Sequence, residues 1–592
     1  MNYIPLGYTM DNIDISLSHA IDVGIPVIFI PILTSRLTKK TSLINELRNY
    51  VPIDTKYLSI ISHIETNIKQ NELSGASITI EINDFNSNTG KHSKHSKHSK
   101  HTQKHNASKI GVKTHTLSKT VPQKLFQLYL VVIKDTPNHH SPKHHSPKHH
   151  SHSSVKPTHN ELLEKARQSG NSIFQIIKTN QIQNINLIYT VCEASFISAL
   201  LEGLLLSTYK FLKYKTDFKP TDTYSPHNIH IISHTCNTIN NSQITIKNAI
   251  LNNLKTEVEC VFLARDLVNE PANADKATMF MDTIRKTIKD WNLPIKMEVL
   301  DMVKLKELGF GLLLGVGAGS SVKNAPRVVI LKYDGDRKYD GDRAGKQSPD
   351  TILLGKGVTF DTGGLDLKSA RSMSEMKSDL AGAATVISFL LGYAKMGGNK
   401  SIYAICPFAE NSIGPNSVKP SDVLKAFNGK TVEVTDTDAE GRLILADCLA
   451  YASKKYPHAK LLDFATLTGQ QESLSCKMFS NILGVNSETE IAKLIKDCSR
   501  INELLVEMPI MESKYIEKLD SKVADIKNVS GNCSADIILS AVFMRQFISD
   551  ITKWIHIDIA GPSFNNAVNI KYMGGEGSGI GVRLLFEYFE CC

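Results

Sequence analysis

Residues that could bind metal lie in two stretches of the chain, Gly355–Gly364 and Asp436–Arg442, about eighty residues apart. With the segment between them, they place four carboxylates, two lysines and an arginine in apolar or glycine-rich surroundings: Asp361, Asp379, Asp438, Glu440, Lys356, Lys368 and Arg442. Four carboxylates in one pocket repel each other by several kcal/mol unless cations lie among them. Divalent metals supply that charge, and two of them about 3.5–4 Å apart form a known hydrolytic device. The pattern therefore indicates a two-metal hydrolase.

The segment Asp436–Gly441 alone resembles the first half of a calcium-binding EF-hand loop. Position 12 of such a loop would be Asp447 rather than glutamate, and the preceding Thr431–Val434 has the composition of a strand rather than a helix. A plain acidic turn is the commonest alternative. However, the segment leads directly into the apolar Leu443–Ala446, where a carboxylate needs a partner or a metal. We therefore favour a metal site.

Strand and helix patterns alternate around these residues. They fall at Val328–Leu331, Thr351–Leu354, Ala381–Ala394, Ser401–Pro407, Leu443–Lys455 and Leu461–Phe464. This order predicts a layered α/β/α domain around a central mixed, largely parallel sheet. Such sheets hold their sites at the carboxyl ends of strands. Lys356 and Asp361 directly follow one apolar strand, and Asp436–Glu440 follow another, so they are placed for such a site.

A chain of 592 residues exceeds what one hydrophobic core usually serves, which predicts two domains. We expect a smaller N-terminal α/β domain over residues 1–215, a linker and connecting helix over 216–270, and a catalytic domain over 271–592. A strand pattern at 78–82 precedes the first of two inserts, 91–119, and a second strand pattern at 125–133 separates it from the other insert, 137–157. These inserts repeat Lys-His-Ser and His-His-Ser-Pro-Lys, so we expect surface loops without a packed core.

The formal charge of +9 is unevenly distributed. Residues 91–156 hold thirteen lysines and one acid, a net +12, so the remaining residues sum to −3. The folded body therefore has no overall nucleic-acid signature, and we expect no nucleic-acid partner for it. The His-rich tracts could chelate Zn, Cu or Ni, or bind an anionic polymer or membrane. A solvated insert without a specific role is the interpretation we favour.

Cysteine usage and the N-terminal sequence indicate a cytoplasmic protein. The ten cysteines are scattered without a CxxC pair, which fits a reducing compartment better than a disulfide framework. The first residues lack the basic and apolar regions of a signal peptide. The apolar stretch Val23–Leu33 is too short to span a bilayer and has the composition of a buried strand, so we expect no membrane segment.

Several motifs in fixed order resemble the M17 leucyl aminopeptidases. They are Leu267–Asn273, Gly355–Gly364, Glu410-Asn411, Lys419–Val423, Gly429–Thr431, Asp438–Leu443 and Ala465–Gly469. The resemblance extends from about Asp266 to the C-terminus. The N-terminal half resembles the family's smaller domain only loosely, and the His-rich tracts are not part of the family pattern.

The resemblance implies a role for each site residue. A tighter metal site would use Lys356, Asp361, Asp379 and Glu440, and a more exchangeable one Asp361, Asp438 and Glu440, with Asp438 also giving its backbone carbonyl. Lys368 would polarise the scissile carbonyl, and Arg442 would hold a bicarbonate ion acting as proton shuttle. The substrate cleft would be lined by Thr466, Leu467 (through its carbonyl), Gly469 and, in the apolar pocket, Met376.

The resemblance also implies an activity. The enzyme would release N-terminal apolar residues, preferably Leu, from peptides, using two divalent ions per subunit (Zn, Mn, Mg or Co), as a homohexamer. Two positions depart from the family pattern: Asp436 stands where Asn is usual, and Thr362 where Ser is usual. Asp436 adds a carboxylate two residues from a metal ligand.

Two other classes of function remain open from the sequence. One is a nucleic-acid-binding regulator on the same fold, and the other a catalytically silent scaffold or metal buffer that uses the His-rich tracts. Metal content after deleting 91–105 and 138–154 would separate these, since about two ions per chain should remain in an enzyme of this type.

Overall fold

The computed structural model describes residues 158–189, 194–217, 224–233, 248–336, 348–565 and 570–591, together with four strands nearer the N-terminus. The chain divides into two compact units. One comprises Asp11–Leu204 and Lys219–Ile246, and the other Met1–Met10, Leu205–Phe218 and Lys247–Cys592. The domain boundaries expected at residues 215 and 270 stay a prediction. Both predicted inserts, 91–119 and 137–157, lie outside the described residues.

The first unit contains a six-stranded sheet. Its order is β1 (Asp14–Ser18), β6 (Asn228–Ser233), β5 (Asn184–Tyr189), β2 (Val27–Leu33), β4 (Phe126–Ile133) and β3 (Ser77–Ile82). Only β3 runs antiparallel to its neighbour, β4. The strands expected at 78–82 and 125–133 are present as β3 and β4.

Two helices of the first unit, α4 (His159–Thr179) and α5 (Ala194–Leu206), approach each other closely. A Cβ atom on Gly170 would lie 2.1 Å from the Leu200 carbonyl oxygen, so only glycine fits there. Beside this contact, Arg167 Nε donates to Glu202 Oε2 at 2.6 Å, and both side chains are buried. The buried ion pair satisfies two charges that would otherwise be costly to bury.

The second unit is built on a nine-stranded sheet. Its order is β16 (Leu505–Glu507), β15 (Ser480–Val485), β18 (Trp554–Asp558), β14 (Lys460–Ala465), β9 (Thr351–Gly355), β11 (Ile402–Asn411), β8 (Arg327–Tyr333) and β7 (Ile295–Leu300), with β10 (Gly357–Asp361) paired to β11. The central strands β18, β14, β9 and β11 are parallel, whereas β15 and β8 run antiparallel to their central neighbours. The prediction of a mixed, largely parallel sheet is confirmed.

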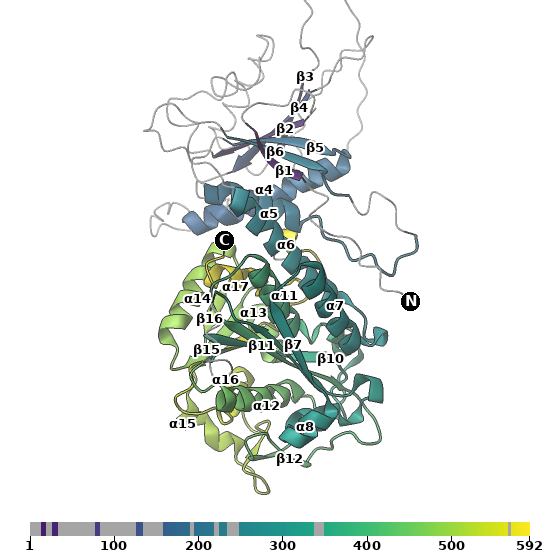
Figure 1. The fold of residues 1–592 in the computed structure, drawn as a ribbon, viewed down its shortest axis with the longest axis vertical. Helices are drawn as coiled ribbons and strands as arrows, with labels where there is room; N and C mark the ends of the chain where they lie inside the picture. The colour runs from purple at the N-terminus through teal and green to yellow at the C-terminus, as the bar shows by residue number, and fades with distance from the viewer. Residues whose placement is uncertain are drawn as a thin grey trace, which may run out of the picture. The chain divides into compact units, whose positions relative to one another are not determined.

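Helices cover both faces of this sheet (Figure 1). One face carries α6 (Asn248–Asn269), α7 (Lys276–Asp290), α11 (Ala381–Lys395) and α17 (Val582–Tyr588), and the other α8 (Met302–Leu308), α9 (Gly311–Val316), α12 (Glu440–Lys455) and α16 (Asp536–Arg545). Helix α6, which lies in the range expected for the connecting helix, packs against α11. Helix α11 is buried from Ala381 to Ala394, which fits its apolar composition. The layered α/β/α prediction is confirmed.

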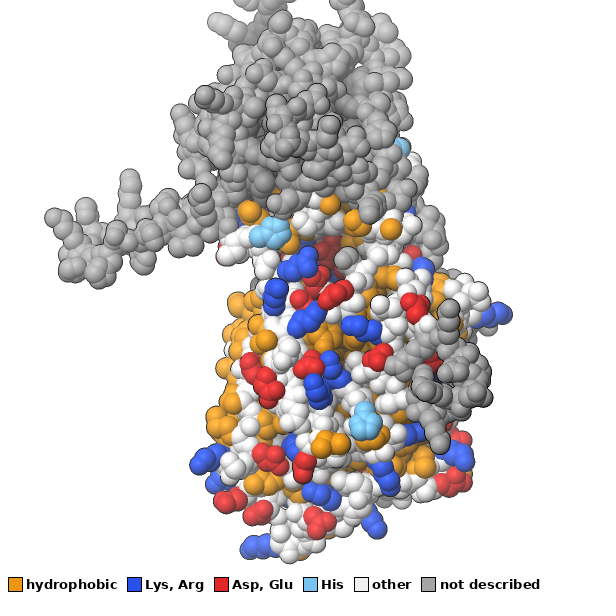
Figure 2. All heavy atoms as spheres, turned by 60° about the vertical axis from the view of Figure 1, so that its left-hand side comes forward, with side chains coloured by type: hydrophobic (Ala, Val, Ile, Leu, Met, Phe, Trp, Pro, Cys, Tyr) orange, Lys and Arg blue, Asp and Glu red, His pale blue; other side chains and the backbone are white. Residues whose placement is uncertain are grey.

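Shorter elements complete this unit. They are the helices α10 (Ala370–Met373), α13 (Gly469–Ser475), α14 (Glu488–Ile501) and α15 (Glu512–Tyr515), and a small sheet of β12 (Val423–Lys425), β13 (Thr431–Glu433) and β17 (Ile526–Lys527). None of the helices in the described ranges is long and apolar enough to cross a membrane. Among the described residues that are coloured in Figure 2, acidic and basic side chains are interspersed on this face.

Candidate active site

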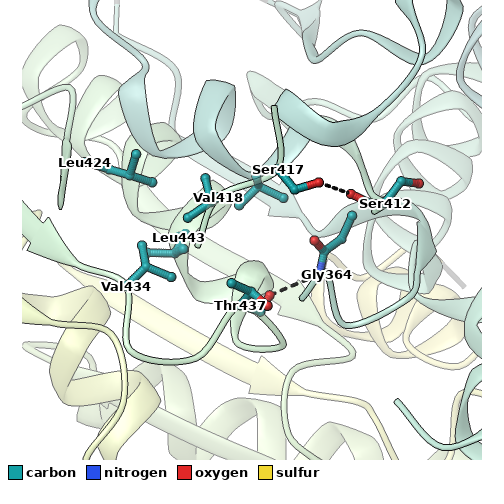
Figure 3. A pocket seen from close by; sticks show the side chains of 10 residues that line it. Gly364, Ser412, Ser417, Val418, Leu424, Val434, Thr437 and Leu443 are labelled. Atoms are coloured by element: carbon teal, nitrogen blue, oxygen red, sulfur yellow. Dashed lines mark hydrogen bonds between the residues drawn. The ribbon is translucent and has the colours of Figure 1, made fainter. Parts of the chain in front are cut away.

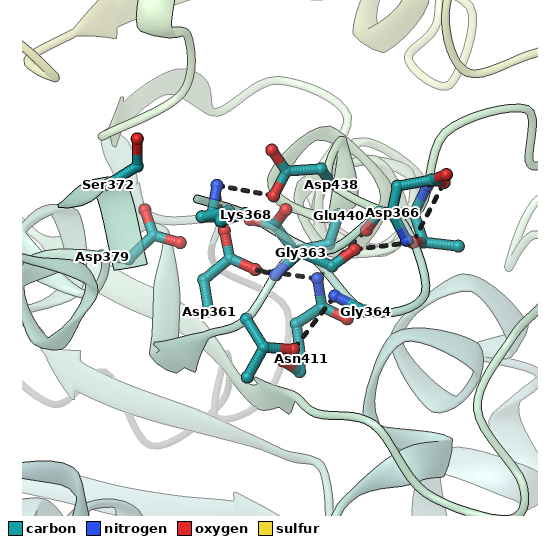
Figure 4. A network of polar contacts seen from close by, with 12 residues as sticks. Asp361, Gly363, Gly364, Asp366, Lys368, Ser372, Asp379, Asn411, Asp438 and Glu440 are labelled. Carbon is teal, nitrogen blue, oxygen red and sulfur yellow. Dashed lines mark hydrogen bonds and ion pairs between the residues drawn. The ribbon is translucent and has the colours of Figure 1, made fainter. Parts of the chain in front are cut away.

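The two motif stretches meet at the carboxyl edge of the central strands. Lys356 joins β9 to β10, Asp361 ends β10, and Thr466 follows β14, which is the direct neighbour of β9. Glu440 is the first residue of α12. Asp379 follows a short helical turn, η7 (Met376–Ser378), and precedes α11. The fold therefore brings together residues from four separate segments of the chain. Figure 4 shows the side chains of Asp361, Asp379 and Glu440 among them.

Lys356 lies in the more buried half of the cluster. Its Nζ is 2.8 Å from Asp379 Oδ1 and 2.8 Å from Glu440 Oε1, and it donates to the Thr466 carbonyl oxygen at 2.8 Å. The Thr466 hydroxyl also donates to Asp379 Oδ1. A Cβ atom on Gly441 would lie 2.6 Å from Lys356 Cε, so the glycine after Glu440 leaves room for this lysine.

Lys368 lies in the more open half. Its Nζ is 2.8 Å from Asp361 Oδ2 and 2.6 Å from Asp438 Oδ1 (Figure 4). The Asp438 side chain is 33% exposed, against 2% for Asp361. The other oxygen of Asp361 accepts from the Gly363 backbone and from Asn411 Nδ2, both at 2.8 Å. These two donors fix the Asp361 carboxylate in one orientation.

Thr437 ties the two motif stretches to each other. Its hydroxyl donates to the Gly363 carbonyl oxygen at 2.6 Å, and its own carbonyl oxygen accepts from Asn411 Nδ2 at 3.0 Å. Gly363 has a positive φ of 86°, and a Cβ atom there would lie 2.3 Å from the Asp366 carbonyl oxygen. Only glycine adopts this turn without strain. The glycine at position 363 therefore allows the segment Asp436–Arg442 to lie close to the segment Gly355–Gly364.

Burial raises the pKa of most carboxyl groups in the cluster. Burial, reinforced by the nearby Glu440, raises the pKa of Asp361, and burial raises that of Asp379 although Lys356 opposes it. Burial and then Asp361 raise the pKa of Asp438 to about 7. For Glu440, burial is outweighed by the two lysines, which lower its pKa. The cluster therefore favours any cation that can enter it.

For the two lysines the neighbouring carboxylates, rather than burial, decide the direction in which the pKa shifts. Burial alone would lower the pKa of Lys356, but Asp379 and Glu440 more than offset it and hold the pKa above its usual range. The same balance, with Asp361 as the largest favourable charge, raises the pKa of Lys368. A divalent cation among these carboxylates would compete with the Lys356 ammonium and lower its pKa.

The donor set fits a divalent metal. Asp361, Asp379 and Glu440 each offer a carboxylate oxygen, and these oxygens lie within 4.8 Å of one another. Asp379 Oδ2 is buried and has no hydrogen-bond partner in the part of the chain that the structure describes. Leaving such an oxygen unsatisfied is costly, and a metal ion would satisfy it. Asp438 is linked to these three carboxylates by Lys368, whose ammonium contacts both Asp361 and Asp438.

Comparison with known proteins shows the family to which the chain belongs. Residues 262–586 match the model of the cytosol aminopeptidase family, catalytic domain. The chain belongs to the M17 cytosol aminopeptidase family. It is 33% identical over 435 residues to a probable cytosol aminopeptidase of Rickettsia canadensis, covering 72% of this chain and 82% of that protein. It is also 33% identical to the cytosol aminopeptidase of Rickettsia prowazekii, over 70% of this chain and 78% of that protein. The chain is therefore a peptidase, and a hydrolase as predicted.

A solved structure shares the fold of this M17 member. The bottromycin maturation enzyme BotP, in complex with Mn, superposes with a TM-score of 0.66. The sequences are 22% identical, and the match covers 95% of this chain and 98% of the other. At that identity the likeness concerns the fold.

The residues expected to line the substrate cleft lie close in the chain to the buried carboxylate cluster of this M17 peptidase or to Thr466, which contacts it. Met376 opens η7, three residues before Asp379, and is partly buried. The Leu467 backbone N–H donates to Asp558 Oδ1 at 3.1 Å, and the exposed Gly469 begins α13. The roles given to these three residues and to Thr466 remain predictions.

A small cavity lies behind the turn at Gly364 and Thr437 (Figure 3). Its lining includes Val418, Val434 and Leu443. The cavity measures about 10 Å³, room for at most a single water molecule. It is therefore too small to accept a substrate side chain.

Arg442, expected to bind bicarbonate, turns toward α16. Its Nη2 is 2.7 Å from Asp536 Oδ1, and Nη1 donates to the Asn528 carbonyl oxygen at 3.1 Å. Sequence reasoning missed Asp536 and gave no role to Asn411, which orients Asp361. The Glu410-Asn411 motif was a usable signal for Asn411, since an amide among buried carboxylates needs a partner. Asp536 lies 94 residues from Arg442, and no local pattern marks it.

Proposed function

We propose that this chain is a metal-dependent leucyl aminopeptidase that cleaves the first residue from peptides using two divalent ions per subunit. The observation that supports this most is the buried trio of Asp361, Asp379 and Glu440 beside two lysines. A purely structural cluster would be expected to satisfy all its buried oxygens, whereas Asp379 Oδ2 has no hydrogen-bond partner among the described residues.

We assign the ligands as the family resemblance implies. The tighter site would comprise Lys356, Asp361, Asp379 and Glu440, and the exchangeable site Asp361, Asp438 and Glu440, where Asp438 also offers its carbonyl oxygen. The greater exposure of Asp438 supports its place in the exchangeable site. A pair of divalent ions would activate water near neutral pH and polarise the peptide carbonyl. Zn, Mn, Mg and Co all suit the oxygen-rich donor set, and the BotP structure contains Mn.

Lys368 is the proposed electrophile. Its ammonium lies between Asp361 and Asp438. Burial alone would lower the pKa of Lys368, but the surrounding carboxylates, Asp361 first, outweigh it and keep the ammonium charged. A charged donor next to the proposed ligands could move from a carboxylate to the carbonyl oxygen of the substrate. There it would stabilise the negative charge that develops as the peptide bond is attacked.

The proposed substrate has an apolar first residue. Met376 would form the apolar pocket, because an unbranched thioether adapts to Leu or Met side chains but offers nothing to a charge. Thr466, the Leu467 carbonyl and Gly469 would hold the peptide backbone along the loop after β14. Burying an unpaired Asp or Lys side chain in such a pocket would cost several kcal/mol.

We further propose that the enzyme is a cytoplasmic homohexamer that acts in peptide catabolism. The support is the family membership and the relatives, which are named cytosol aminopeptidases.

The test is hydrolysis of leucyl amide by the full chain before and after metal removal. Chelation should abolish activity, and Mn, Co or Zn should restore it, whereas aspartyl amide should be a poor substrate throughout. A metal-free enzyme with its full rate would overturn the metal-dependent mechanism. Comparable kcat/KM for leucyl and aspartyl amide would overturn only the pocket assignment.

A further inference from the structure

The guanidinium of Arg442 already has an anionic partner within the chain. Arg442 is 2% exposed and lies in the first turn of α12, two residues after Glu440. Asp536 Oδ1 is 2.7 Å from its Nη2, and the Asn528 carbonyl oxygen is 3.1 Å from its Nη1. Only Nε lacks a hydrogen-bond partner among the residues described. An added anion would therefore have to displace Asp536 to bind at Nη2.

Asp536 is held in this place by the active-site segments themselves. It is the first residue of α16, which packs against α12. The next backbone N–H, that of Ile537, donates to Gln470 Oε1 at 3.1 Å, and Gln470 Nε2 donates to the Ser534 carbonyl oxygen. Gln470 directly follows Gly469 of the proposed substrate loop. The start of α16 is thus fixed between the loop after β14 and the helix that begins with Glu440.

Asp536 has the chemistry of the anion it would replace. A carboxylate and bicarbonate are both planar oxyanions that a guanidinium binds. Asp536 contacts Arg442 through one of its two oxygens, Oδ1. The N-terminus of a helix also stabilises a negative charge. A buried arginine needs such a counter-charge, because an unpaired buried charge is strongly destabilising.

We propose that Asp536 is the built-in anion of Arg442, and that this enzyme works without bicarbonate. The proposal rests on the aminopeptidase function proposed above. Asp536 is then a positioning residue whose carboxylate lies beside Arg442, where the family resemblance implies a bound bicarbonate ion. The disagreement between that expectation and the observed ion pair is the basis of the proposal.

The experiment compares the metal-loaded full chain with Asp536→Ala and Asp536→Asn, each with and without added bicarbonate. The first readout is kcat on leucyl amide, and the second is binding of ¹³C-labelled bicarbonate followed by its NMR line width. Wild-type kcat should not respond to bicarbonate, and the label should not bind. Asp536→Ala should lose about tenfold or more in kcat in bicarbonate-free buffer. Added bicarbonate should bind to this variant and restore its rate.

Asp550→Ala is the matched control. Asp550 follows the C-terminal end of α16 and pairs with Arg545 Nη2 at the same 2.7 Å, but its side chain is 98% exposed. This variant should behave as wild type in both readouts. If Asp536→Ala does not fold, Asp536→Asn decides, since it keeps the shape and an oxygen acceptor while removing the charge.

Three outcomes would overturn the proposal. They are wild type that slows in the absence of bicarbonate, wild type that binds the label, and an Asp536→Ala variant that keeps its full rate without binding it. Failure of the peptidase proposal is distinguishable from these. An enzyme inactive on leucyl amide under all conditions would contradict the proposed function, while the binding of labelled bicarbonate would still test the role of Asp536.

Discussion

Helix α12 carries two buried acids that the protein satisfies in different ways. Glu440, its first residue, is held by the ammonium of Lys356. Asp447, seven residues later, accepts three backbone N–H groups: Leu312 and Leu313 on Oδ2 at 2.9 and 3.0 Å, and Phe427 on Oδ1 at 2.8 Å. Both side chains are almost completely buried.

The pKa values of these two acids shift in opposite directions. Burial would raise the pKa of Glu440, but Lys356 and Lys368 outweigh it and lower the pKa. For Asp447 burial dominates over the backbone hydrogen bonds and raises the pKa to about 7. A lysine side chain can move aside for a metal ion, whereas backbone donors can be withdrawn only by unfolding. We conclude that Glu440 belongs to a site that can exchange partners, and Asp447 to the framework that positions it.

Removing the charge of Glu440 should have the largest effect on activity. Glu440→Gln should lower kcat by at least about 10³-fold and reduce bound metal, because the proposed bridging ligand loses its charge. The measurement is leucyl-amide turnover together with metal analysis of the dialysed protein. Unchanged metal content with near-normal kcat would show that Glu440 is a structural acid like Asp447, and would break the comparison.

Lys368→Ala should show whether Lys368 stabilises the transition state or instead helps to hold the metals. Loss of one donor to a developing oxyanion costs about 2.7–4 kcal/mol, so kcat should fall by about 10²–10³ while both metals stay bound. Lys377→Ala is the control, because Lys377 donates to the Asn269 carbonyl oxygen rather than to a carboxylate of the cluster. A kcat for Lys368→Ala within threefold of the control would remove Lys368 from the mechanism.

Asp447→Asn should affect stability and leave the chemistry intact. The amide presents N–H groups where backbone N–H groups already point, so the variant should lose about 2–4 kcal/mol of unfolding free energy. The folded fraction should keep its metal and its kcat. Urea unfolding monitored alongside turnover would check both, and a stable variant with impaired turnover would contradict the framework role.

The same pair predicts a pH dependence. The pKa of Asp447 rises from 3.8 to about 7 on folding, so the folded state retains a proton that the unfolded state releases. Its contribution to stability is therefore fully present below about pH 4 and is lost as the pH rises toward 7. The stability of wild type relative to Asp447→Asn should fall over that range.

The sequence predicted the strands that carry Lys356 and Asp361, because apolar runs followed by glycine and charge are local patterns. Asp379 was included among the candidate carboxylates because it lies between the two motifs, but only the resemblance assigned it to the tighter metal site. Asp447 appeared only as a failed position of a calcium loop, since its partners Leu312 and Leu313 lie more than 130 residues away in the chain. Asp536 escaped notice for the same reason. Whether a buried acid supports the fold or belongs to the active site depends on hydrogen bonds to residues far away in the chain. The spacing of residues in the sequence does not reveal these hydrogen bonds.

Asp436 gives the smallest expected effect and the finest test of this distinction. It is the carboxylate that replaces the family's usual Asn, and its Oδ1 accepts the backbone N–H of Asp438 at 2.8 Å. An amide oxygen can accept the same hydrogen bond, so Asp436→Asn should keep kcat and metal affinity within about threefold of wild type. Asp436→Ala removes the acceptor and should lower kcat by up to about tenfold, because the turn that presents Asp438 loses one hydrogen bond. Turnover with Mn and with Zn should be measured for both variants. A change of metal preference in Asp436→Asn would mean that this carboxylate acts on the metals directly. An acid whose oxygen accepts a backbone hydrogen bond could then still belong to the active site, and the distinction drawn from Asp447 would fail.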